Sequence, residues 1–272
     1  MKKWLLTIIS LVLAVTLTAC GGNESDENTL VVGATSKPHG DILEEAKNIL
    51  KDEYDIDLEI KIFDDYFIFN RALDAGDLDA NYFQHQPFFE DSVETNGYDL
   101  VNLGGIHIEP FGFYSKQIKS IDELKKDDVI IISNSAADYG RVLSILDKAG
   151  VIELDKNVKV QNATTKDIVS NPLNLEFKEI NPEILTSAYE NNEAALVAIN
   201  GNFAIDAGLN PTKDAVLLES ASQDNPYVNI VACKKGNEND KKIKALMEVL
   251  KSDQIKEFIT STYSDGSVIP VN

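Results

Sequence analysis

Short apolar runs that end in polar residues and lead into a helical pattern recur along this chain. Residues 30–34 (Leu-Val-Val-Gly-Ala) are followed by Thr35 and Ser36 and then by apolar residues at helical spacing, and residues 129–132 lead in the same way into Ser133. Such alternation indicates strands followed by helices. It predicts an α/β fold with a largely parallel sheet that has helices on both faces.

The polar residues that follow these runs mark a candidate binding crevice. Parallel sheets bind ligands beyond the carboxyl ends of their strands. Polar clusters stand at such positions after four runs, at residues 35–38, 64–66, 133–135 and 200–202. Each cluster alone is also typical of turns. Four clusters at equivalent positions favour a binding site.

The N-terminus predicts export and lipid attachment. Lys2 and Lys3 precede an uncharged stretch that ends with Leu-Thr-Ala before Cys20. We interpret residues 1–19 as a lipoprotein signal peptide and Cys20 as the lipidated first mature residue, the alternative being an ordinary signal peptide with an incidental cysteine. Residues 20–28 are polar and predict a flexible tether. We therefore expect a lipid-anchored protein on the extracytoplasmic face of the cell membrane.

Charge excludes one class of partner. The chain has 45 acidic and 25 basic residues and a net charge of −20 at pH 7, which argues against binding to nucleic acid. Cys20 and Cys233 are the two cysteines, and lipidation of the first would leave the second unpaired. Stability must then come from packing, in one large domain or two lobes.

No pattern of catalytic residues stands out. The sequence shows no nucleophile elbow, no cysteine placed near a histidine and no glycine-rich phosphate loop. We therefore predict no enzyme activity, no catalytic residue and no cofactor, and an extracytoplasmic hydrolase ranks third among the function classes.

The histidines raise a metal alternative. Extracytoplasmic metal-capture proteins use histidine with a carboxylate to bind zinc or manganese. No two of His39, His85 and His107 stand at a short metal-ligand spacing. Satisfied polar histidines are the preferred interpretation, so we predict no metal site, while a set that converges in space remains the alternative.

The two arginines differ in their surroundings. Arg71 falls on a predicted exposed helical face, whereas Arg141 is predicted in the first turn of the helix after residues 133–135. A guanidinium there, with free backbone N–H groups, can hold a carboxylate. A surface pair with Asp138 is the alternative.

Amide and aromatic residues suggest an amino-acid pocket. Residues 81–85 (Asn-Tyr-Phe-Gln-His) interleave the two kinds of side chain, and Asn229 lies within an apolar strand. A buried asparagine needs partners for its donors and its acceptor. A zwitterionic amino acid would supply both, with rings enclosing its side chain.

These residues resemble the NLPA lipoprotein family, the methionine-binding lipoproteins of ABC importers. The resemblance covers essentially the whole mature chain and is most specific at residues 79–85. It rests on the segments 32–35 with Pro38-His39, 65–66 with Asn70, 79–85, 109–115, 140–141, 200–204 and 226–229.

The resemblance implies a two-lobed, type II periplasmic-binding-protein fold with the ligand cleft between the lobes. It places lobe I at 29–112 plus 228–272 and lobe II at 113–227, with hinge crossings near 112–115 and 225–228. It also implies a monomer that captures L-methionine, D-methionine, a methionine-containing dipeptide or another apolar amino acid and delivers it to the permease of an ABC importer. By analogy Arg141 holds the ligand carboxylate, Asn202 and Asn229 orient its backbone, and Tyr66, Tyr82, Phe83 and His85 line the pocket.

Two segments depart from the family pattern. The family usually has Pro-Thr-Asn where this chain has Ala136, Ala137 and Asp138, and it often has proline where this chain has Phe69. Asp138 would place a negative charge beside Arg141, where it could hold an ammonium group or repel a carboxylate. The identity of the ligand therefore stays open within this set.

Overall fold

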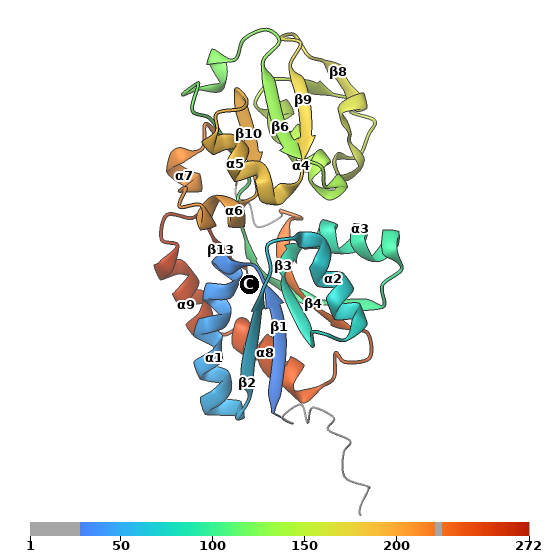
Figure 1. The fold of residues 1–272 in the computed structure, drawn as a ribbon, viewed down its shortest axis with the longest axis vertical. Coiled ribbons are helices and arrows are strands. Elements are labelled where there is room, and N and C mark those ends of the chain that lie inside the picture. Colours follow the sequence, from blue (N-terminus) through green and yellow to red (C-terminus); the bar gives the residue numbers. More distant parts are fainter. Residues whose placement is uncertain (1–27, 221–224, 272) are drawn as a thin grey trace, which may run out of the picture.

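The computed structural model describes residues 28–220 and 225–271, which form two lobes stacked along the long axis of the molecule (Figure 1). Each lobe is built around its own β-sheet. Cys20, the predicted signal peptide and nearly all of the predicted tether lie outside the described residues.

Lobe I carries a six-stranded sheet in the order β13-β4-β12-β3-β1-β2. Its strands are β1 (Thr29–Ala34), β2 (Asp57–Ile62), β3 (Ala80–His85), β4 (Leu100–Ile108), β12 (Val228–Lys234) and β13 (Ile269–Pro270). Its helices are α1 (Asp41–Tyr54), α2 (Tyr66–Ala75), α3 (Gln86–Asn96), α8 (Lys241–Leu250) and α9 (Asp253–Thr262).

Lobe II carries a five-stranded sheet in the order β11-β5-β10-β6-β9 and a small sheet of β7 and β8. The strands are β5 (Gly112–Tyr114), β6 (Val129–Ser133), β7 (Glu153–Leu154), β8 (Ile168–Ser170), β9 (Glu176–Ile180), β10 (Leu196–Ile199) and β11 (Leu217–Leu218). The helices are α4 (Ala136–Lys148), α5 (Leu185–Glu190), α6 (Gly201–Asp206) and α7 (Pro211–Asp214).

Both main sheets are mixed, whereas the sequence pattern predicted largely parallel pairing. β12 runs antiparallel to β3 and β4, and β5 runs antiparallel to β10 and β11. Each of these two strands directly follows a connection from the other lobe. Its direction is therefore not set by a helix that packs back onto its own sheet, which is what makes consecutive strands parallel.

The predicted apolar run at 129–132 illustrates why a strand forms there. Ile130 and Ile132 face one core with Leu143 and Leu146 of α4, while Ile131 faces another core with Leu185 of α5. Successive residues of a strand point to opposite faces, so a strand covered on both faces is apolar throughout.

Two connections join the lobes. The first consists of Glu109, Pro110 and Phe111, just before the segment 112–115 that the resemblance implied, because residues 112–114 already pair with β10. The second leads from β11 to β12 and includes Asn225, Pro226 and Tyr227. Side chains from both connections lie next to the space between the lobes.

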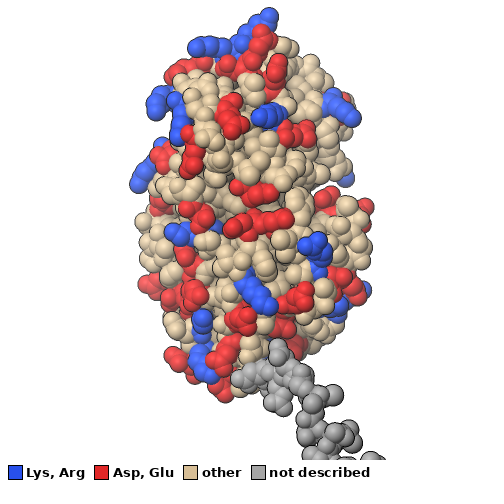
Figure 2. All heavy atoms as spheres, viewed as in Figure 1, with Lys and Arg blue, Asp and Glu red and all other residues tan. Residues whose placement is uncertain are grey.

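The surface carries the acidic excess of the chain. Figure 2 shows acidic side chains over both lobes, with several gathered at the waist between them. Within residues 28–220 and 225–271, no helix is both long and apolar enough to span a bilayer.

Candidate ligand-binding site

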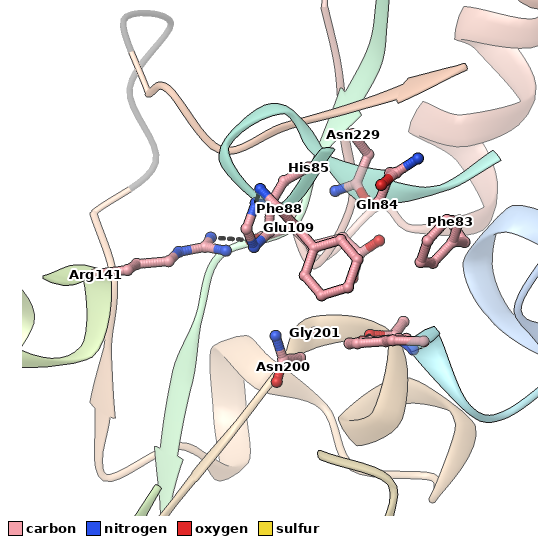
Figure 3. A pocket seen from close by; sticks show the side chains of 11 residues that line it. Phe83, Gln84, His85, Phe88, Glu109, Arg141, Asn200, Gly201 and Asn229 are labelled. Atoms are coloured by element: carbon pink, nitrogen blue, oxygen red, sulfur yellow. Dashed lines mark hydrogen bonds between the residues drawn. The ribbon is translucent and has the colours of Figure 1, made fainter. Parts of the chain in front are cut away.

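A pocket with an empty volume of about 360 Å³ lies between the lobes (Figure 3). This figure includes space open to solvent; the cavity itself measures about 20 Å³, well below the roughly 300–1,000 Å³ of typical small-molecule sites, so the lobes are nearly shut on each other here. Lobe II and lobe I face each other across it. The lining residues are Tyr66, Phe83, Gln84, His85, Phe88, Glu109, Arg141, Asn200, Gly201, Asn202 and Asn229.

Most residues predicted for the site come together here, but Tyr82 does not line the pocket. Tyr82 is fully buried in the core of lobe I, where its hydroxyl group bonds Nδ1 of His107. Its side chain packs in the core of lobe I, while that of Phe83 packs with Tyr66 and Phe69; the register of β3 against β12 shifts here, so strict alternation does not continue to Gln84. The three residues that follow it, Phe83, Gln84 and His85, reach the pocket instead.

Aromatic rings form one wall of the pocket. The Tyr66 ring stacks on Phe203 with centroids 5.0 Å apart, and it lies 5.9 Å from Phe83 and 5.8 Å from Phe88. Phe83 in turn stacks on Phe69 at 3.9 Å. Because Phe203 belongs to lobe II and Tyr66 to lobe I, this wall also joins the lobes.

Hydrogen bonds across the cleft also join the two lobes. Burial, Glu109 and Asp138 raise the pKa of Tyr66, so its phenol stays protonated and donates to Oδ1 of Asn202. His85 Nε2 lies 3.0 Å from Oδ1 of Asp138. Both contacts run from lobe I to lobe II, and together with the ring stack they hold the lobes in a closed arrangement.

Asp138 pairs with His85 and not with Arg141. Burial acts to raise the pKa of Asp138, but the hydrogen bond and charge of His85, with Arg141 and Asn200, outweigh it and lower this pKa. Asp138 is only 1 % exposed and does not line the pocket. The departure from the family pattern thus creates a contact between the lobes.

Arg141 has an internal carboxylate partner. Its Nη2 donates to Glu219 at 2.6 Å and to the backbone oxygen of Glu109 at 2.8 Å, and its guanidinium lies 4.4 Å from the Tyr227 ring centroid. Burial acts to raise the pKa of Glu219, but Arg141 outweighs it and lowers this pKa. The surface pair with Asp138 that the sequence left open is therefore not formed.

The position of Arg141 on its helix also differs from the prediction. α4 begins at Ala136 after the N-cap Ser135, so Arg141 lies in the second turn, and Asp138 occupies the first turn. Among the described residues, no hydrogen bond uses Nη1 of Arg141. This atom is the part of the guanidinium left for a ligand. Arg71 is exposed, as predicted.

Asn200 lines the pocket but is not among the residues predicted for the site, although the sequence marks the cluster 200–202 as a candidate. It follows the buried strand β10 directly and is 6 % exposed. Its Nδ2 donates weakly to Asp138 at 3.4 Å, and within the described part of the chain its Oδ1 has no partner. A buried acceptor without a partner is rare, and here it stands beside a pocket.

Two of the three histidines meet Glu109 in the interior. His107 Nε2 lies 2.7 Å and His39 Nε2 3.5 Å from Oε1 of Glu109. Burial lowers the pKa of His39 to about 4 and that of His107 to about 3, so both rings are neutral at pH 7. Their ligating atoms and that of Glu109 lie within 4.8 Å of one another, a spacing that a metal ion could accept. His85 stands apart from this group.

Asn229 is held in the pocket by the same group, since His39 Nε2 lies 3.1 Å from its Oδ1. Gln84 belongs to a buried amide network in which it bonds Asn70 and Asn81. Asn229 and Gln84 are thus fixed by contacts within lobe I. Such prior fixing reduces the entropy cost of binding.

The family model described as NlpA lipoprotein matches residues 30–272. The chain belongs to the NlpA lipoprotein family. This match covers nearly all of the described residues, so both lobes and the pocket between them fall within it.

Individual relatives agree with this assignment. The methionine-binding lipoprotein MetQ of Bacillus subtilis is 49% identical over 276 residues, which cover 100% of both chains. A nutrient-binding protein of Burkholderia cenocepacia, solved bound to methionine, is 33% identical with a TM-score of 0.83, over 89% of this chain and 99% of that one.

A periplasmic substrate-binding protein of an ABC transporter from Coxiella burnetii is 34% identical with a TM-score of 0.83, over 89% of this chain and 100% of that one. The two solved structures confirm the two-lobed solute-binding fold. These names describe binding proteins for transport, and they give no support to the zinc or manganese alternative.

Proposed function

We propose that this NlpA-family lipoprotein captures methionine, or a close relative of it, outside the membrane and delivers it to the permease of an ABC importer. The observation that carries the proposal is a pocket between the two lobes with aromatic rings on one side and Arg141 with asparagines on the other. The relatives that are named for methionine support it.

Each part of methionine finds a matching group. Nη1 of Arg141 can bind the carboxylate from a guanidinium that Glu219 already holds in place. Asn200, Asn202 and Asn229 offer amide groups to the backbone of the ligand. Tyr66 and the phenylalanines suit a thioether, because sulfur–aromatic contacts contribute about 0.3–1.5 kcal/mol each.

Closure of the lobes is the mechanism of capture in this proposal. Tyr66 with Asn202 and His85 with Asp138 join the lobes only when they are close together. A ligand that touches both lobes favours that state, because it binds the closed form better than the open one. Closure also removes water, which strengthens the contact with Arg141.

The proposal also includes the membrane anchor of the protein and the residue limits of its two lobes. We assign lobe I to residues 29–112 plus 228–272 and lobe II to 113–227, in a monomer tethered to the extracytoplasmic face of the membrane through lipid on Cys20. The two sheets support this division, since their strands fall on either side of these limits within one residue.

Isothermal titration calorimetry on the soluble chain from residue 21 onward tests the ligand. We expect saturable one-to-one binding of L-methionine, weaker or equal binding of D-methionine or a methionine dipeptide, and no binding of zinc. Binding of zinc without binding of any methionine compound would replace this proposal with the metal alternative.

A further inference from the structure

The polar side chains on one part of the pocket wall use their hydrogen-bond donors within the protein. This part, the lobe I wall, is formed by α2, β3 and α3 and consists of Tyr66, Phe83, Gln84, His85 and Phe88 (Figure 3). The Tyr66 hydroxyl donates to Oδ1 of Asn202. Because Nδ1 of His85 accepts the backbone N–H of Phe88, the ring proton lies on Nε2, which bonds Asp138. The remaining polar side chain, an amide, decides whether this wall offers a donor to a ligand.

Both N–H groups of that amide are donated to buried asparagines. Nε2 of Gln84 donates to Oδ1 of Asn70 at 2.9 Å and to Oδ1 of Asn81 at 3.0 Å. All three side chains are buried. A side-chain amide has two N–H groups, so Gln84 lines the pocket but has none left for a ligand.

Asn70 holds the Gln84 amide in this orientation. Its Nδ2 donates back to Oε1 of Gln84 at 2.8 Å and to Oγ of Ser92 at 3.1 Å. Its Oδ1 also accepts from Nδ2 of Asn81 at 2.9 Å. Both N–H groups and both acceptor positions of Asn70 are thus used. Turning the Gln84 amide over would set donor against donor and acceptor against acceptor, so the paired bonds keep it from doing so.

This amide network lies at the aromatic end of the pocket. Asn70 directly follows Phe69 on α2, and the Phe69 ring stacks on Phe83 of the lobe I wall. Gln84 directly follows Phe83 on β3. A ligand side chain enclosed by these rings would therefore lie beside Gln84. Among the described residues of the lobe I wall, it would meet no side-chain donor that is free.

We propose that Asn70 is a specificity-determining positioning residue, which holds the donors of Gln84 away from the ligand and so excludes amino acids whose side chain carries an acceptor oxygen. This inference rests on the proposed function and makes it more specific. Methionine sulfoxide is the sharpest case, because it is methionine with one oxygen added to sulfur. That oxygen loses its water in the pocket and finds no donor, whereas a thioether is a weak acceptor and loses little.

The test compares L-methionine with L-methionine sulfoxide by calorimetry on the soluble chain. The measured quantity is the ratio of the two affinities, in the wild type, in Asn70→Ala and in the double variant Asn70→Ala with Gln84→Leu. Leu73→Ala is the matched control, because Leu73 is buried on the same helix but lies outside the amide network.

We expect the wild-type chain to bind methionine about 100-fold more tightly than the sulfoxide, since burial leaves the added oxygen without a donor. Asn70→Ala frees one N–H of Gln84 and should reduce this ratio about 10-fold, roughly the contribution of one hydrogen bond. The double variant removes the freed amide and should restore the ratio toward the wild-type value. Leu73→Ala should lower the melting temperature and preserve the ratio.

A second variant covers the case in which Asn70→Ala does not fold. Asn81→Ala frees the other N–H of Gln84 and should reduce the ratio by a similar factor. An unchanged ratio in the single variants, or a ratio that stays low in the double variant, would overturn the inference, because the effect would then not pass through Gln84.

The wild-type measurement separates this inference from the proposed function. Equal affinities of the wild-type chain for methionine and its sulfoxide would overturn the inference, leave the proposed function intact and need no variant. Failure of the wild-type chain to bind methionine would instead overturn the proposed function.

Discussion

Arg141 and Glu219 form a buried ion pair, with Nη2 2.6 Å from Oε2, that lies against both connections between the lobes. Phe111 N of the first connection donates to Glu219, and the Tyr227 ring of the second lies under the guanidinium. The arginine is thus fixed where the two lobes join, before a ligand arrives. A fixed guanidinium binds a carboxylate with little ordering cost.

Replacing this arginine should abolish tight binding. Arg141→Ala should weaken methionine binding by about 2–5 kcal/mol, because it removes the charged partner of a desolvated carboxylate. Arg71→Ala, at an exposed position, is the control and should bind as the wild type does.

The single variant also leaves Glu219 buried without its partner, so Arg141→Ala with Glu219→Gln should be made in parallel. The double variant should recover thermal stability but not affinity. Wild-type affinity in either variant, measured by calorimetry, would remove Arg141 from the site.

The contact between His85 and Asp138 should matter for closure. Asp138→Ala should weaken methionine binding by about 1–3 kcal/mol, since it leaves a buried histidine unpaired in the closed state. Asp138→Asn keeps an acceptor for His85 and should lose less. Small-angle scattering of the ligand-bound protein should show a larger radius of gyration for Asp138→Ala. Tighter binding by both variants would mean that Asp138 repels the ligand carboxylate.

Acid should weaken the fold through the two buried histidines. Their folded pKa values, about 4 for His39 and about 3 for His107, lie below the unfolded value of 6.5. The stability they contribute is complete above pH 6.5 and is lost as the pH falls toward these values, at up to about 1.4 kcal/mol per pH unit for each group. Glu109, whose pKa burial raises, titrates in the opposite sense and reduces the net slope.

Urea unfolding at pH 7, 6 and 5 measures this effect. The free energy of unfolding of the wild-type chain should fall faster between pH 7 and 5 than that of His107→Gln. Parallel pH profiles for the two proteins would show that His107 is not a source of acid sensitivity.

Cys20→Ser should release the protein from membranes. We expect the wild-type chain to sediment with the membrane fraction and to carry fatty acid, and the variant to appear in the soluble extracytoplasmic fraction. A variant that still sediments after a salt wash would show that another segment holds the protein at the membrane.

The order of elements and much of the pocket could be predicted from the sequence. The run at 129–132 and its following helix gave strand β6 and α4, because a strand covered on both faces must be apolar. Residues 81–85 predicted a pocket wall, of which Phe83, Gln84 and His85 reach the pocket while Tyr82 packs in the core of lobe I. The register shift of β3 against β12 at this point has no signal in the local sequence.

Contacts between distant segments could not be predicted. Glu219 is one acidic residue among 45, and nothing local marks it as the partner of Arg141 78 positions earlier. Similarly, His39 lies beside Glu109 only because η1, the turn Ser36–Gly40 before α1, and the end of β4 are brought together in the fold, whereas His107 and Glu109 are two residues apart in the sequence. Local spacing carries no record of such convergence.

The most direct test of the account is a crystal structure of the soluble chain grown with L-methionine. The account predicts the carboxylate of methionine at Nη1 of Arg141, its backbone nitrogen beside the asparagines of the pocket, and its sulfur among Tyr66, Phe83 and Phe88. A pocket in which Arg141 contacts only Glu219 while methionine is absent, or lies outside the cleft, would contradict it.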